Sequence, residues 1–76
     1  MDPIEAARTV LREEGAPLHW TRIQDLALRR GYLDPFSGMD VRRELLAALA
    51  AAARDGTLTA VDRGVYALPA GEAGRG

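Results

Sequence analysis

The hydrophobic pattern of this chain changes its period once, close to Gly56. Before that point apolar residues recur every three or four positions in three stretches, which is the period of an amphipathic helix. After it, apolar and polar residues alternate over 57–61 and 65–68, on either side of a short loop that ends in Gly64. Alternation around such a loop predicts a β-hairpin. The sequence therefore predicts three helices followed by a hairpin.

Residues that cap or end helices mark the limits of the first two. Pro3 suits the first position of a helix and Gly15 suits its end, so the first helix is expected between them. Thr21, followed three positions later by Gln24, matches a capping box. This pair predicts that Thr21 caps the second helix, which Gly31 then ends.

The third helix is expected to run from a cap at Asp40 or Ser37 to about Arg54. Its apolar residues form one stripe that we expect to be buried: Val41, Leu45, Ala48, Leu49 and Ala52. Aromatic side chains of the whole chain are expected in the core or at its rim: Trp20, Tyr32, Phe36 and Tyr66.

A chain of 76 residues allows one domain. Extended backbone at 18–20 fits a short strand between the first two helices. The order helix, strand, helix, helix, hairpin is that of a winged helix-turn-helix, a mainly α fold with a small β-hairpin wing. We expect this domain over residues 1–68 and a flexible tail over 69–76, which is rich in glycine.

Several classes of function lack their signatures in this sequence. There is no cysteine, only one histidine (His19), and no glycine-rich loop that would cradle phosphate. We therefore expect neither an enzyme nor a metal or cofactor site. No apolar run approaches the roughly 20 residues of a membrane span, and the first residues lack the pattern of a signal peptide. These features lead us to expect a cytoplasmic protein that does not bind membranes.

Two segments resemble the HARE-HTH family of winged-helix domains. They are residues 15–23 (GAPLHWTRI) and 58–68 (LTAVDRGVYAL), and the resemblance extends over about residues 4–68. Val41, Leu45 and Leu49 stand where the family places the apolar residues of its third helix. The family occurs in chromatin factors, restriction endonucleases and the delta subunit of bacterial RNA polymerase. The resemblance implies a winged helix that takes part in DNA transactions or in transcription regulation.

The first functional hypothesis is a module that binds double-stranded DNA. On a helical wheel, Arg43, Ala47, Ala50 and Arg54 lie opposite the buried stripe of the third helix. The residues expected to contact DNA are arginines of this helix, of the second helix and of the wing: Arg22, Arg42, Arg43, Arg54 and Arg63.

The second hypothesis is a protein-interaction module without direct reading of DNA. Ten arginines and eleven acidic residues leave a net charge of −1, without the basic excess typical of nucleic-acid binders. Leu28 and Leu46 fall away from the apolar stripes of their helices, and Ala50 lies beside Leu46. These three residues are the candidate interface for RNA polymerase, another protein or a second copy of the chain. The sequence leaves both hypotheses open.

Overall fold

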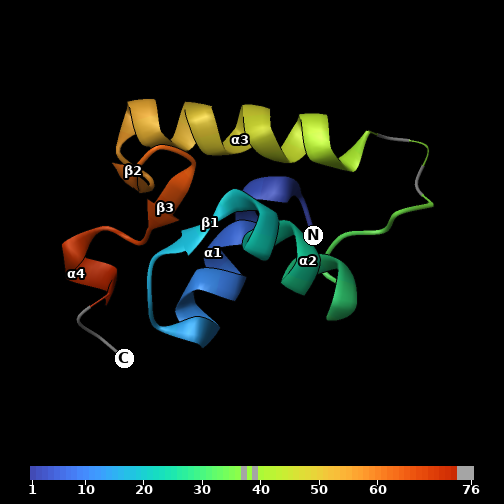
Figure 1. The fold of residues 1–76 in the computed structure, drawn as a ribbon, viewed down its shortest axis with the longest axis horizontal. Helices are drawn as coiled ribbons and strands as arrows, with labels where there is room; N and C mark the ends of the chain where they lie inside the picture. The colour runs from blue at the N-terminus through green and yellow to red at the C-terminus, as the bar shows by residue number, and fades with distance from the viewer. Residues whose placement is uncertain (37, 39, 74–76) are drawn as a thin grey trace.

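The computed structural model describes residues 1–36, 38 and 40–73. Three long helices and three short strands are followed by a single helical turn. In chain order the elements are α1 (Pro3–Glu14), β1 (Leu18–His19), α2 (Trp20–Arg29), α3 (Val41–Asp55), β2 (Thr59–Asp62), β3 (Val65–Ala67) and α4 (Ala70–Ala73). Figure 1 shows α3 along one side of the molecule, with α1 and α2 beside it and the hairpin at its C-terminal end.

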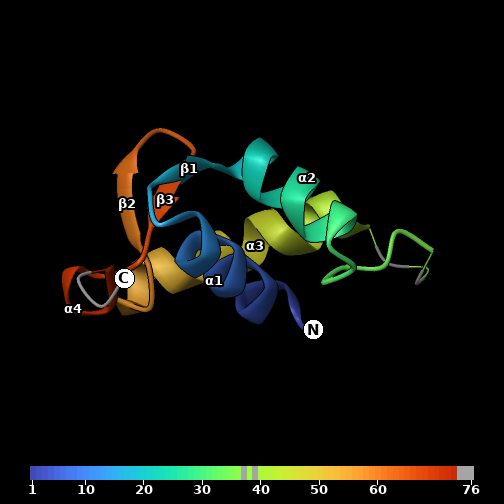
Figure 2. The same ribbon diagram turned by 90° about the horizontal axis from the view of Figure 1, so that it is seen from below.

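The strands form one antiparallel sheet in the order β1-β3-β2. Leu18 of β1 pairs with Tyr66 of β3, and Thr59 of β2 pairs with Ala67. The register shifts between Ala60 and Asp62, and Val61 in this bulge is 50% exposed. In Figure 2 the β2–β3 hairpin stands beside the helices as a wing. The fold class predicted from the sequence is confirmed: three helices and a small antiparallel sheet in the order of a winged helix.

The core joins all three long helices to the wing. Leu11 of α1, Ile23 of α2 and Leu45 and Leu49 of α3 are at most 1% exposed and belong to one cluster with Leu58. A second cluster lies between α1, α2 and the loop after α2, with these buried members: Ala6, Val10, Leu26, Ala27 and Leu33. In the stripe expected on α3, the side chains of Leu45, Leu49 and Ala52 are buried, whereas Val41 and Ala48 at its edge are half-buried.

The expected capping box at Thr21 and Gln24 is wrong, because α2 begins one residue before Thr21. The N-cap is His19, whose Nδ1 accepts a hydrogen bond of 3.3 Å from the backbone N–H of Thr21. The backbone N–H of Trp20 donates to the carbonyl oxygen of Gly64 at 2.8 Å. The wing thus satisfies a donor at the start of α2, and a helix start of this kind has no sequence signal of its own.

Phe36 does not lie in the core or at its rim, as the sequence suggested, but is 91% exposed. The backbone N–H of Phe36 donates to Oδ1 of Asp34 at 2.8 Å, which forms a turn. Leu33, three residues earlier, fills the buried position of this loop instead and is 8% exposed. The loop after α2 therefore runs away from the helices, as Figures 1 and 2 both show. The other three aromatic side chains, of Trp20, Tyr32 and Tyr66, are half-buried.

The tail expected to be flexible contains the one-turn helix α4, and residues 74–76 lie outside the described residues. Pro69 precedes the turn, which fits the preference of proline for the residues next to a helix start. The domain boundary at residue 68 therefore stays a prediction.

A polar network ties the end of α1 to the end of α2. Arg30 donates to Glu13 and Glu14 at 2.8 Å each, and the hydroxyl of Tyr32 donates to Glu13. The hydrogen bond from Tyr32, together with the charge and hydrogen bond of Arg30, lowers the pKa of Glu13 from its ordinary value of 4.5. The same hydrogen bond raises the pKa of Tyr32.

This network makes a testable contribution to acid stability. Because the pKa of Glu13 is lowered by folding, its contribution is present above pH 4.5 and is lost as the pH falls through the lowered value. We expect Glu13→Gln to lower the melting temperature near pH 7 and to have a smaller effect near pH 3. Thermal unfolding followed by circular dichroism at both pH values measures this difference. An equal loss at the two pH values would contradict a charge-dependent role.

Candidate nucleic-acid interface

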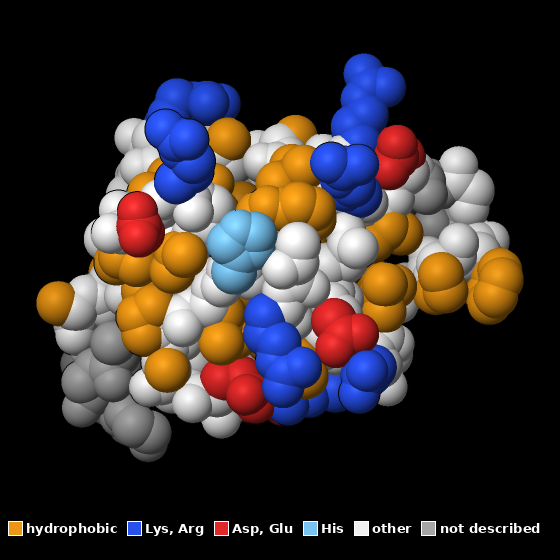
Figure 3. Space-filling model, viewed as in Figure 1, with side chains coloured by type: hydrophobic (Ala, Val, Ile, Leu, Met, Phe, Trp, Pro, Cys, Tyr) orange, Lys and Arg blue, Asp and Glu red, His pale blue; other side chains and the backbone are white. Residues whose placement is uncertain are grey.

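The face of α3 opposite the core carries arginines separated by alanines. Arg43, Ala47 and Arg54 are exposed there, and Ala50 is half-buried beside them. Arg42 is also exposed, on the flank of the helix that turns toward α2. Figure 3 shows basic side chains in two groups along the edge formed by α3 and the wing, with hydrophobic side chains between them. The structure therefore places three of the five predicted DNA-contact residues on one helix.

Ion pairing divides the arginines into two sets. Arg22 and Arg29 pair with Asp25, at 3.5 and 3.1 Å, and Arg30 pairs with Glu13 and Glu14. Four other arginines form no ion pair with any carboxylate of the described residues: Arg42, Arg43, Arg54 and Arg63. We call these four the open arginines. All of them belong to α3 or to the wing, so the charge available to an anionic partner is concentrated there.

Trp20 holds one of the open arginines in position. The guanidinium carbon of Arg42 lies 5.4 Å from the centre of the Trp20 ring, within range of a cation–π interaction. The indole in turn lies beside the His19 ring, with 5.8 Å between ring centres. Stacking on one face of the guanidinium leaves its N–H donors free to bind phosphate. Trp20 was predicted to lie in the core or at its rim, and no sequence signal points to this role, since 21 residues separate it from Arg42.

Arg63 lies at the tip of the wing, in the turn between β2 and β3. Its backbone N–H donates to Oδ1 of Asp62 at 2.7 Å, so the neighbouring carboxylate takes part in the turn. The side chain of Arg63 is exposed. The wing is attached to the start of α2 through the hydrogen bond between Gly64 and Trp20, which fixes Arg63 relative to Arg42.

Gly64 is required at this attachment. Its φ is +72°, and an added Cβ would lie 2.9 Å from Nε2 of His19 and 3.2 Å from Cδ1 of Trp20. We expect Gly64→Ala to lower the free energy of unfolding by about 1–2 kcal/mol from the left-handed backbone alone, and by more through the contacts.

The matched control for this prediction is Gly31→Ala. Gly31 also has a positive φ, of +77°, but an added Cβ would meet nothing within 4 Å. Chemical denaturation of the two variants separates backbone strain from contact. If both variants lose the same stability, the close approach of the wing to His19 and Trp20 is not significant.

The three candidate protein-interface residues, Leu28, Leu46 and Ala50, differ in their surroundings. Leu28 was expected to be exposed, but it is half-buried and packs against the second cluster, with Tyr32 and Val41. The expectation of exposure is wrong because the second cluster, which includes Leu33 just after α2, extends to that side of the helix. Leu46 was also expected to be exposed and is likewise half-buried, as is Ala50 on the same helix. Leu46 is one turn beyond Arg42, on the flank that faces α2 and the wing.

Neither a metal-binding cluster nor a membrane-spanning helix is found among the described residues. Among those residues there is no group of three or more histidine, cysteine, aspartate or glutamate side chains that could hold a metal ion. None of the described helices has the length and apolar character needed to cross a membrane. A comparison of the chain with models of known protein families, with curated proteins and with solved structures finds no match. The resemblance to HARE-HTH domains therefore stays a prediction from the sequence.

Proposed function

We propose that this domain binds double-stranded DNA, with α3 and the wing against the duplex. The observation that carries the proposal is the concentration of the four open arginines on these two elements. Arginines already paired with carboxylates must give up those partners before they can bind phosphate, whereas the open arginines need not. Contacts to phosphate supply most of the affinity of a protein for DNA of any sequence.

The spacing of Arg43 and Arg54 suits the two sides of a major groove. They lie eleven positions apart on one helix face, which corresponds to about 16 Å along the axis, while the groove is about 12 Å wide. Ala47 and Ala50 between them allow a close approach to the floor of the groove. Alanine offers no hydrogen bond to base edges, so we expect binding with little sequence preference.

The net charge of −1 does not oppose this proposal, because acidic and basic side chains occupy different sides of α3. Glu44 and Asp55 of α3 line two cavities on the side of α1. Asp2 lines both cavities, and Glu5 lines the one beside Asp55. These carboxylates lie on the other side of α3 from Arg42, whereas Asp62 lies beside Arg63 in the wing and Asp55 is next to Arg54. We expect the field along α3 near Arg42 and Arg43 to be more positive than the net charge indicates.

Titration of the domain with a fluorescent duplex of random sequence at two salt concentrations tests the proposal. Four phosphate contacts predict a slope of about −3.6 for the logarithm of the association constant against that of salt. Affinity should thus fall about a hundredfold between 50 and 200 mM salt. Failure to bind more tightly than about 10⁻⁴ M at the lower salt would reject the proposal for this domain.

A protein-interaction module is the second candidate, favoured by the partly exposed Leu46 in the middle of α3. RNA polymerase or a second copy of the chain could bury this side chain with Ala50. Leu46→Glu tests this candidate, because it should abolish such a contact or dimer. An acidic side chain beside the open arginines would also weaken DNA binding, so sedimentation mass is the better readout. An unchanged mass and unchanged partner binding would count against this candidate.

A further inference from the structure

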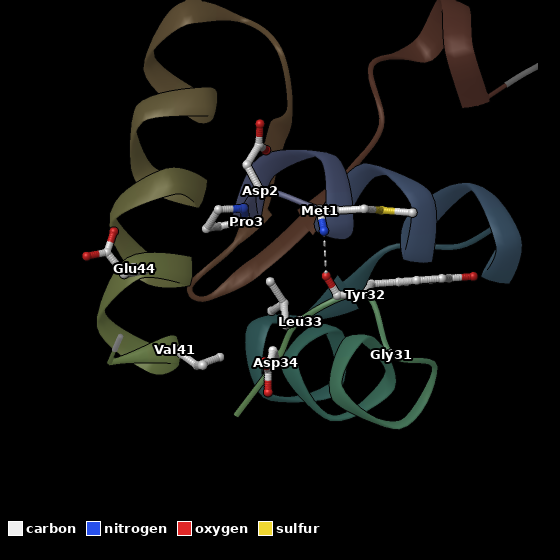
Figure 4. A pocket seen from close by; sticks show the side chains of 9 residues that line it. All are labelled: Met1, Asp2, Pro3, Gly31, Tyr32, Leu33, Asp34, Val41 and Glu44. Atoms are coloured by element: carbon white, nitrogen blue, oxygen red, sulfur yellow. Dashed lines mark hydrogen bonds between the residues drawn. The ribbon is translucent and has the colours of Figure 1, made fainter. Parts of the chain in front are cut away.

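An apolar depression outside the proposed DNA face lies where three segments meet. The start of α1, the loop after α2 and the first turn of α3 enclose a pocket of about 310 Å³. Leu33 lies near its centre, with Pro3 and Val41 beside it (Figure 4). Pockets for small molecules range from about 300 to 1,000 Å³. The volume of this pocket is at the lower limit of that range, and it suits a single apolar side chain.

The margin of the pocket is acidic. Asp2, Asp34 and Glu44 are among the residues that line it, with the carboxylates of Asp2 and Glu44 pointing outward from Leu33 in Figure 4, and none of the lining residues is an arginine. Within the part of the chain that the structure describes, these three carboxylates form no ion pair. Oδ1 of Asp2 and Oδ1 of Asp34 accept backbone hydrogen bonds, which leaves the second oxygen of each available. The α-amino group of Met1 donates to the carbonyl oxygen of Tyr32 at 3.2 Å. The residues that line the pocket therefore include one cationic group and three carboxylates.

Phe36 adds an aromatic surface next to this margin. It lies two residues beyond Asp34 on the same loop and is 91% exposed. A free aromatic ring near carboxylates attracts the cations of arginine and lysine through its face. Nothing in the core explains a phenylalanine at this position, since Leu33 already fills the buried site of the loop.

We propose that this pocket binds a basic peptide segment of a protein partner, in which one aliphatic or aromatic side chain is flanked by arginine or lysine. The apolar side chain enters the pocket over Leu33, and the flanking cations meet Asp34, Glu44 and the ring of Phe36. The chemistry is complementary in both respects, apolar at the centre and oppositely charged at the margin. Phosphate would be repelled by the same carboxylates, so this surface is distinct from the proposed DNA face and does not depend on it.

Synthetic peptides and the isotope-labelled domain test the proposal. The probe peptides carry a central leucine or phenylalanine between two arginines on each side. Control peptides replace the arginines by glutamate, or the central residue by glycine. In heteronuclear NMR spectra we expect the probes, and neither control, to shift the backbone signals of Leu33, Val41 and Glu44. No binding by any probe at about 1 mM, equal binding by a control, or shifts confined to other surfaces would overturn the proposal.

Variants of the margin sharpen this test. Asp34→Asn with Glu44→Gln keeps the hydrogen bond from Phe36 to residue 34 and removes two charges. We expect about three- to tenfold weaker binding of the probes, since exposed ion pairs contribute up to about 1 kcal/mol each. Asp55→Asn is the matched control, a loss of charge at the far end of α3. Equal affinity in all three proteins would reject the role of the acidic margin, and self-association without peptide binding would assign the pocket to a second copy.

Discussion

A variant with all four open arginines replaced by glutamine is expected to bind duplex DNA about four thousandfold more weakly at 0.1 M salt. Each phosphate contact adds about 0.9 to the slope of the logarithm of the association constant against that of salt. On going from 1 M to 0.1 M salt, four contacts therefore raise the logarithm of the association constant by about 3.6. The slope itself should approach zero. Fluorescence anisotropy over a series of salt concentrations measures both quantities.

Single substitutions provide the control for this prediction. Arg43→Gln and Arg29→Gln remove the same charge from exposed positions of two helices. Arg29 pairs with Asp25 and lies outside the proposed DNA face. We expect Arg43→Gln to reduce the salt slope by about one and Arg29→Gln to leave it nearly unchanged. An equal effect of the two substitutions would mean that only the net charge matters, and would contradict binding through α3.

Replacing Leu49 by alanine is expected to lower the free energy of unfolding by about 2–5 kcal/mol. Leu49 is 0% exposed and lies in the cluster that joins α1, α2, α3 and the wing. A domain of this length is stable by roughly 4–11 kcal/mol. The cavity left by the missing side chain therefore removes a large fraction of the total. Urea denaturation followed by circular dichroism measures the loss.

Leu46→Ala is the matched control for this substitution. It removes the same atoms from the same helix, but at a half-buried position. We expect a much smaller loss of stability, since less apolar surface returns to water. If Leu46→Ala costs as much as Leu49→Ala, the packing of α3 differs from the arrangement described above.

The fold could be predicted from the sequence because its signals are local. The 3.6-residue period before Gly56, the alternation after it and the turn at Gly64 each depend on residues close in the chain. Leu45 and Leu49, chosen from the helical period, are both 0% exposed. Such patterns are present in the sequence because each element is stabilised by the burial of one face, which requires apolar residues at regular spacing.

The errors depend on how each segment packs against the rest of the molecule. His19 caps α2, and Thr21 does not, because Gly64 of the wing accepts the hydrogen bond of Trp20. Phe36 is exposed because Leu33 reaches the buried position of the loop first. Neither competition has a signature in a short window of sequence.

The candidate site was predicted in part. Sequence reasoning gathered the arginines of α3 and the wing, but could not separate Arg22 from them. Only the three-dimensional arrangement shows that Arg22 lies 3.5 Å from Asp25, whereas Arg42 lies over Trp20. The acidic pocket around Leu33 could not be predicted from the sequence either, because its lining comes from three separate segments of the chain.

Mapping of NMR signals on addition of a random-sequence duplex tests the central claim most directly. If α3 and the wing lie against DNA, backbone signals of Ala47, Ala50 and Arg63 should shift, while those of Leu33 and Tyr32 stay in place. Signals that move around Leu33 and not along α3, or that do not move at all, would contradict the claim.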